Sequence, residues 1–328
     1  MLFRFSILVL VLVLASMSSL VVGSANISIS DVFSIFAGGN VPAMESTIIF
    51  DIRLPRIVLA VFVGAGIAAS GAAIQGLFRN PLADPALIGV SSGAALFAAL
   101  YLVLGAGILS ALPGLTLSAF VGGLITTCLV LEVGRRGGTI SAMLLAGVAI
   151  NALAIACIGL LSYVSTDMQL RSVTFWALGS LGGSDWDGVL VASGIPFVIL
   201  LLFLERTRLN AITLGDQEAN YLGISVSALR VRIVLLTALA VSIGVALTGV
   251  IAFVGLVVPH LIRLTMGSSH QIVIPASALL GGILLLIADT LSRTLFAPAE
   301  VPVGILTALI GGPFFIVLIM RQKGKLGI

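Results

Sequence analysis

The chain has 328 residues, of which 59% are apolar and 9% are charged, and its mean hydropathy is +1.27. A water-soluble fold of this length cannot bury so much apolar surface, so the composition excludes a soluble globular protein and indicates an integral membrane protein. The net charge is only +3. Basic loops that contact anionic membrane lipid account for it, and nothing suggests that the chain binds nucleic acid.

Apolar windows separated by proline, glycine or charge predict ten membrane-spanning helices, most of them near the length of about 20 residues that a bilayer requires. These windows are 3–23, 54–77, 87–107, 114–134, 141–164, 189–204, 230–250, 254–267, 272–295 and 304–320, of which the eighth is short. The windows are continuously apolar, whereas the strands of a membrane barrel alternate between apolar and polar residues. The expected fold class is therefore an all-α polytopic bundle that forms one transmembrane domain over residues 1–328.

The positions of lysine and arginine predict the orientation, because cytoplasmic loops carry an excess of basic residues. With the N-terminus inside, twelve of the 16 basic residues fall on the inner side, and an even number of spans leaves both termini in the cytoplasm. The inner set is Arg4, Arg79, Arg135, Arg136, Arg206, Arg208, Arg230, Arg232, Arg263, Arg321, Lys323 and Lys325. The outer set is Arg53, Arg56, Arg171 and Arg293.

The first apolar segment has a second interpretation. Arg4, an apolar run and Gly23-Ser24-Ala25 are also compatible with a cleaved signal peptide. We expect a retained span, because the apolar run is long for a signal core and cleavage would leave nine spans.

Residues 205–232 break the apolar pattern with seven charges and the pattern of two short helices. In this insert, Asp216 is a candidate N-cap residue and Gly223 a candidate helix stop. A compact helix at one membrane face offers a surface that another protein can bind. The alternative is an ordinary solvated loop between two spans.

The sequence also bears on the energy source. A phosphate-binding loop needs a lysine within a glycine-rich motif, but the only lysines, Lys323 and Lys325, lie in the tail outside such a motif. If ATP drives this protein, a separate subunit binds it. Ion coupling is the alternative, and its best candidate is Asp289. Arg293 lies four residues later on the same helix face, and an acid already paired in this way is a poor proton carrier.

A third function class, an intramembrane serine hydrolase, is suggested by Gly89-Val90-Ser91-Ser92-Gly93. Such an enzyme needs a base, and the chain has only His260 and His270. Nothing in the sequence places either of them beside Ser91. We therefore predict no catalytic residue and no metal site in this chain.

Arginines on the outer side oppose the orientation bias, so they invite an explanation beyond topology. The guanidinium groups of Arg53, Arg56 and Arg293 can receive carboxylates from a soluble partner. The alternative is interfacial anchoring, or pairing with Asp51 and Asp289. The fourth, Arg171, lies in the polar and aromatic stretch 169–183, which is expected to form a short helix at the outer mouth of a pathway.

Several stretches together resemble one protein family. They are Arg53-Leu54-Pro55-Arg56, Ser70-Gly71 with Gln75, Arg79-Asn80-Pro81-Leu82-Ala83-Asp84-Pro85 with Gly89, Phe253-Val254-Gly255-Leu256-Val257-Val258-Pro259-His260 with Arg263, Asp289 with Arg293, Val301-Pro302-Val303-Gly304, and Gly311-Gly312-Pro313-Phe314. In order and spacing, from about residue 45 to residue 320, the chain resembles the iron-siderophore, haem and cobalamin permeases of type II ABC importers.

The resemblance implies a ten-helix permease in the bacterial inner membrane that forms a homodimer, with two ATPase subunits inside and one periplasmic substrate-binding protein outside. ATP and Mg²⁺ would be bound by the ATPase, and no cofactor by this chain. The insert would correspond to the coupling helices that contact the ATPase, at Leu214, Gly215, Asp216, Ala219, Leu222 and Gly223. Asp216 stands where the family more often has glutamate, which keeps the negative charge. The resemblance also favours Arg53, Arg56 and Arg293 as residues that dock the binding protein.

Stretches 169–181 and 76–81 look most like the haem permeases of the family, so haem is the expected substrate, with ferric siderophore or cobalamin as the alternative. Arg171 would then attract a haem propionate, and Phe175 and Trp176 would offer flat apolar contact. His260 is a candidate for the cytoplasmic exit, although a packing role is the stronger interpretation for a residue that follows Pro259.

Overall fold

The computed structural model describes residues 1–23, 27–37, 39, 42–105 and 112–322. Its elements are helical, and the described residues contain no β-strand. The α-helices are α1 (Leu2–Val21), α2 (Ile29–Phe36), α3 (Ala43–Thr47), α4 (Leu54–Leu77), α5 (Val90–Leu100), α6 (Leu112–Gly137), α7 (Ile140–Val164), α8 (Asp167–Ala177), α9 (Trp186–Ala192), α10 (Gly194–Leu204), α11 (Arg206–Ile212), α12 (Asp216–Tyr221), α13 (Val226–Thr248), α14 (Val254–Met266), α15 (His270–Thr294) and α16 (Val303–Gln322). Two π-helices, η1 (Ile48–Arg53) and η3 (Tyr101–Gly105), and the 3-10 helix η2 (Pro85–Ile88) complete the described elements.

The all-helical bundle predicted from composition is confirmed. Seven helical segments are long and apolar enough to cross a bilayer, and three shorter apolar helices, Val90–Gly105, Val254–Met266 and Val303–Val317, fall on the third, eighth and tenth predicted spans. The second span begins at Leu54 as predicted, but α3 and η1 extend its helical path back to Ala43. The sixth span consists of two helices, α9 and α10, which meet at Ser193. Ser24, Ala25, the end of the third predicted span, Lys323 and Lys325 lie outside the described residues.

Helix α4 forms the centre of the bundle and is buried along most of its length. It packs against α10, α13, α14 and, most extensively, α15. Small residues make this close approach possible, because a Cβ atom at Gly64 would lie 2.3 Å from the carbonyl oxygen of Gly281 on α15. Ala60 and Ala68, on the same face as Gly64, are fully buried. This face therefore serves helix packing.

Replacing Gly64 with alanine is expected to destabilise the bundle by about 1–3 kcal/mol, because the new methyl group must push the backbones of α4 and α15 apart. Gly159→Ala is the matched control, since Gly159 also lies within a long apolar helix and a Cβ atom there meets nothing within 4 Å. Thermal unfolding of the purified protein in detergent measures both effects. Equal apparent Tm values for the two variants would contradict the packing argument.

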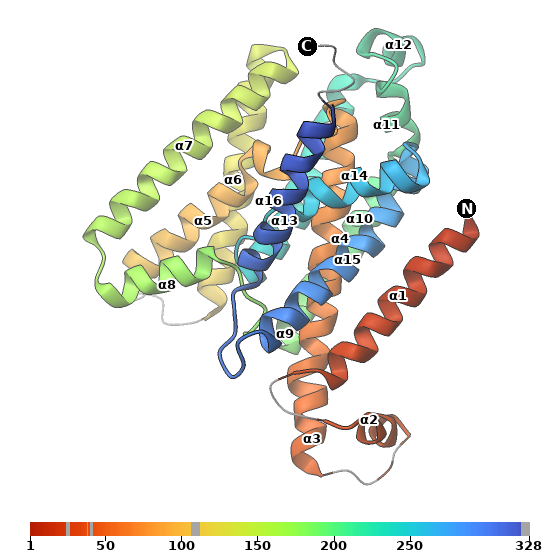
Figure 1. Ribbon diagram of the computed structural model, residues 1–328. Helices are drawn as coiled ribbons and strands as arrows, with labels where there is room; N and C mark the ends of the chain where they lie inside the picture. The colour runs from red at the N-terminus through yellow and green to blue at the C-terminus, as the bar shows by residue number, and fades with distance from the viewer. Residues whose placement is uncertain (24–26, 38, 40–41, 106–111, 323–328) are drawn as a thin grey trace.

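The bundle has two distinct ends (Figure 1). One end carries α11, α12 and the connection between α6 and α7, and we call it the α12 end. The opposite end carries α2, α3, α8 and α9, and we call it the α8 end. The predicted polar insert and the predicted short polar-aromatic helix thus lie at opposite ends of the molecule.

Candidate functional site

Five charged residues meet at the α8 end, and we call them the arginine cluster. Its members are Arg53, Arg56, Asp289, Arg293 and Glu300. They come from η1, α4, α15 and the segment before α16, so the cluster joins parts of the chain that lie more than 230 residues apart.

Asp289 lies at the centre of the cluster and is fully buried. Arg56 donates from Nε to both of its oxygens, at 2.9 and 3.0 Å, and the Arg293 Nε atom lies 3.4 Å from Oδ2. The i, i+4 pair predicted between Asp289 and Arg293 is therefore present, and Arg56 binds the same carboxylate. A carboxylate held by two arginines has the geometry of a structural ion pair, which removes the best candidate for a proton carrier.

Two of the arginines also fasten α1 to the bundle. Arg53 donates to the carbonyl oxygens of Leu20 and Val21, the latter at 3.0 Å. Arg293 donates to Ser19 Oγ at 2.7 Å. The Arg53 guanidinium group thus satisfies carbonyl oxygens that the last turn of α1 leaves without intrahelical partners.

The three predicted docking arginines are brought together, but not as exposed groups. Arg53, Arg56 and Arg293 are only 3%, 5% and 6% exposed in the single chain. They pair with Asp289, Glu300 and α1, because a cation near the membrane must find an acceptor when burial removes its water. The pairing with Asp289, given above as the alternative interpretation, is thus present. Their docking role stays a prediction.

The predicted helix at the pathway mouth is α8, which begins with a capping box between Thr166 and Gln169. Gln169 also donates to the carbonyl oxygen of Val103 at 2.9 Å, which fixes α8 against η3. Arg171 and Phe175 are exposed and, four residues apart, lie on one face. No ion pair joins Arg171 to an acid within the described part of the chain. Trp176 is half-buried and packs against the core instead.

His260 lies within α14 and is buried, and neither of its ring nitrogens has a hydrogen-bond partner among the described residues. This position agrees with the packing interpretation. His270, the other histidine, is bound through Nδ1 to Asn210 at 2.7 Å. No hydrogen bond between a histidine and Ser91 occurs in the described ranges, so the structure gives the hydrolase hypothesis no support.

At the α12 end, α11 and α12 form the two short helices predicted for the insert. Leu209, Ile212 and Ala219 are buried, and α11 packs against α4 and α15. Leu214 and Leu222, in contrast, are 67% and 63% exposed. The insert is therefore seated on the central helices and presents these two apolar side chains outward.

The ends of α12 differ in part from the prediction. Gly215 is the N-cap, and Asp216 is the first residue of the helix, so its predicted capping role is wrong. The Asp216 carboxylate instead lies 3.1 Å from Arg79 and 3.5 Å from Arg230, which ties α12 to the end of α4 and to α13. The predicted stop is confirmed: Gly223 has a φ of +78°, and Ile224 N–H donates to Ala219 while Gly223 N–H donates to Asn220.

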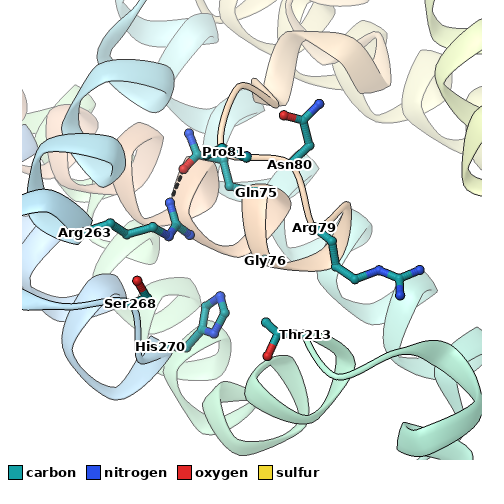
Figure 2. Close-up of a pocket in the computed structure, with 9 residues that line it drawn as sticks. All are labelled: Gln75, Gly76, Arg79, Asn80, Pro81, Thr213, Arg263, Ser268 and His270. Carbon is teal, nitrogen blue, oxygen red and sulfur yellow. Dashed lines mark hydrogen bonds between the residues drawn. The ribbon is translucent and has the colours of Figure 1, made fainter. Parts of the chain in front are cut away.

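A cavity of about 340 Å³ lies beside the insert (Figure 2). Its lining contains no acidic residue: Gln75, Gly76, Arg79, Asn80, Pro81, Thr213, Arg263, Ser268 and His270. Arg263 donates to the side-chain oxygen of Gln75, and Gln75 in turn donates to Leu256 at 3.1 Å, which fixes α14 to α4. The guanidinium group of Arg79 points away from the cavity, consistent with its pairing with Asp216.

The loop that follows α4 is held by Asp84, whose side chain accepts a hydrogen bond from the Ala86 N–H at 2.8 Å. Burial raises the pKa of the Asp84 carboxyl, an effect that this hydrogen bond opposes. Arg79 in the same loop has a φ of +52°, a left-handed conformation that is uncommon outside glycine. The loop between α4 and α5 is thus held in a defined conformation between the insert and the bundle core.

The architecture is that of a polytopic membrane protein, with a seated polar insert at one end and a short polar-aromatic helix at the other. The model of the FecCD transport family matches residues 9–321, so the chain belongs to this family. HmuU, the hemin transport system permease protein of Yersinia pestis, is 51% identical over 278 residues, which are 83% of this chain and 83% of that protein. BtuC, the vitamin B12 import system permease protein of Salmonella typhi, is 38% identical over 315 residues, covering 95% and 93%.

A solved structure of a metal-chelate type ABC transporter in an inward-facing conformation is similar along nearly the whole chain. Its TM-score is 0.86 at 36% identity, and the match covers 96% of this chain and 97% of that one. The family and the fold together make this chain a membrane permease of the ABC transporter type.

Sequence reasoning missed two acids that form ion pairs at these sites. Glu300 binds Arg56, and Glu205 binds Arg208 at 2.7 Å and Arg232 at 3.0 Å at the base of the insert. Glu205 directly follows the sixth predicted span and Glu300 lies between the ninth and the tenth, which was the available signal. Charged residues are common at the ends of spans, so the sequence positions of these two acids did not reveal which arginines they bind.

Proposed function

We propose that this chain is the permease subunit of an ATP-driven importer that moves haem from a periplasmic binding protein into the cytoplasm. The subunit works as a homodimer with two ATPase subunits, in the inner membrane of a bacterium. The α12 end and both termini face the cytoplasm, and the α8 end faces the periplasm.

The observation that carries the importer mechanism is the seated insert. Leu214 and Leu222 offer an apolar surface, while buried side chains and the Asp216 ion pairs connect that surface to α4, α13 and α15. A partner that changes shape with bound ATP and holds this surface can therefore move the central helices. Movement of this kind is what alternating access requires, since it needs a partner whose contacts differ between the two states.

The proposal of haem rests on α8 and on the relatives. Arg171 supplies a cation without an acidic partner among the described residues, and Phe175 supplies an exposed aromatic face one turn away. Met168, on the same face, is also exposed. A propionate and a flat apolar ring system fit this combination. The 51% identity with the hemin permease favours the same substrate over ferric siderophore or cobalamin.

The experiment that tests this function is ATP hydrolysis and uptake in proteoliposomes that contain the chain with its ATPase and binding protein. Haem, a ferric siderophore and cobalamin are compared as substrates. Stimulation by haem alone supports the whole proposal, whereas stimulation by another ligand keeps the importer and replaces the substrate. If no ATPase subunit associates with the chain, ion-coupled transport becomes the leading mechanism.

The Arg171→Ala variant is expected to slow haem uptake by about tenfold, the effect of about 1.4 kcal/mol of lost attraction, while assembly with the ATPase stays unchanged. Arg136→Ala, which removes an exposed arginine at the end of α6, is the control and should transport normally. The same proteoliposome assay measures both variants. Haem uptake at the unmodified rate in Arg171→Ala would remove this residue from the substrate pathway.

A further inference from the structure

Besides the central carboxylate of Asp289, the arginine cluster contains a second acid, Glu300. Glu300 accepts two parallel hydrogen bonds from Arg56, one from each terminal nitrogen, both at 3.0 Å. This bidentate arrangement is the strongest that arginine makes with a carboxylate. Asp289 binds the Nε side of Arg56, so carboxylates occupy two edges of its planar guanidinium group.

The two acids are held to very different degrees. Asp289 is fully buried and bound by two arginines. The Glu300 side chain is 39% exposed, and Arg56 is its only ion-pair partner within the described residues. Water can therefore hydrate the Glu300 carboxylate when it leaves Arg56, whereas the Asp289 carboxylate is closed off from water.

The backbone beside Glu300 is fixed independently of its carboxylate. Val301 N–H donates to the carbonyl oxygen of Ser292 at 3.1 Å, and Ser292 Oγ donates to the Val301 carbonyl at 2.6 Å. Residues 295–300 just before it are exposed. The Glu300 side chain can therefore rotate into water without any change in the segment that carries it.

Rotation of the Glu300 side chain into water changes the net charge of the arginine cluster. Three arginines and two acids give the cluster a net charge of about +1, and it rises to about +2 when the Glu300 carboxylate leaves. Departure of Glu300 also leaves Nη1 of Arg56 without its carboxylate partner, while Nη2 stays 2.9 Å from Asp289.

We propose that Glu300 is an internal competitor for Arg56: in the free subunit it occupies the place that a carboxylate of the binding protein takes when the two proteins dock. This inference rests on the proposed docking role of the arginines. It explains why Arg56 is covered by an acid in the single chain although it would receive a carboxylate on docking. Docking then exchanges one carboxylate for another, so the contact is weaker than with an unoccupied arginine and the binding protein is released readily.

The test measures the affinity of the binding protein for the permease–ATPase complex in nanodiscs at low and high salt. Glu300→Gln keeps the size of the side chain and removes its charge, and it is expected to tighten binding about threefold to tenfold and to steepen the salt dependence. Glu132→Gln, which removes an acid at the end of α6 that pairs only with Arg135 and Arg136 in the described chain, is the control and should change nothing.

The variant Arg56→Gln distinguishes the competitor role of Glu300 from the docking role of the arginines, on which it rests. It should weaken binding, and adding Glu300→Gln to it should have no further effect. Weakened binding in Arg56→Gln combined with unchanged affinity in Glu300→Gln would overturn the competitor and keep the docking site. No effect of Arg56→Gln would overturn both. If Arg56→Gln does not fold, Arg56→Lys replaces it, because lysine keeps the charge but cannot form the bidentate contact.

Discussion

Replacing Leu222 with aspartate is expected to uncouple this permease from its ATPase, with a loss of affinity of about 30-fold or more. The Leu222 side chain is 63% exposed on the insert and has no role in the core of the single chain. Burying a leucine at a protein interface contributes about 2–3 kcal/mol, and each 1.4 kcal/mol is a factor of ten. An aspartate at the same place also carries a charge into an apolar contact, which adds to the loss.

Co-purification of the ATPase with the permease measures this effect, and transport-dependent ATP hydrolysis measures its consequence. Met44→Asp is the matched control, because Met44 is also apolar and is 76% exposed but lies on α3 at the other end of the bundle. The control complex should retain its ATPase. An ATPase that remains bound and coupled to the Leu222→Asp variant would show that the insert is an ordinary solvated loop.

The second large effect is expected inside the arginine cluster, where Asp289→Asn should destabilise the protein by about 3–5 kcal/mol. The substitution leaves Arg293 without an acid and removes one of the two partners of Arg56, while both arginines remain buried. It should also loosen α1, because Arg293 holds Ser19.

The apparent Tm in detergent is the measurement, and a decrease of about 5 °C or more is expected. Asp187→Asn serves as the control, since Asp187 is an exposed acid in the first turn of α9 and its loss should cost less than about 1 kcal/mol. A variant Asp289→Asn as stable as the control would mean that the buried network contributes little. The arginines would then be held in place by packing alone.

Much of the fold was predictable from the sequence because membrane helices are determined locally. Within a bilayer every backbone N–H and C=O group must find its partner inside the segment, so a continuous apolar run is by itself sufficient to indicate a helix. The ten apolar windows and the helix stop at Gly223 are local features of this kind. The family resemblance was likewise a property of ordered motifs along the chain.

The candidate sites were only partly predictable. Asp216 looked like a cap because an acid that begins a short helix usually has that role, but a cation on either side of it attracts its carboxylate more strongly. The outer arginines looked exposed because the sequence places them at span ends. Their burial depends on how α1 and α15 approach α4, which no local pattern contains.

The sequence by itself determined that this protein is a helical membrane permease, which segments cross the bilayer, and where the polar insert interrupts them. Only the tertiary structure decided which acid each arginine binds, that Glu300 covers Arg56, and that the insert is seated on α4 and α15. The physical reason is that the two kinds of interaction act over different separations along the chain. Backbone hydrogen bonding and apolar content act over a few neighbouring residues, whereas an ion pair forms between whichever charges the packed helices bring within about 4 Å.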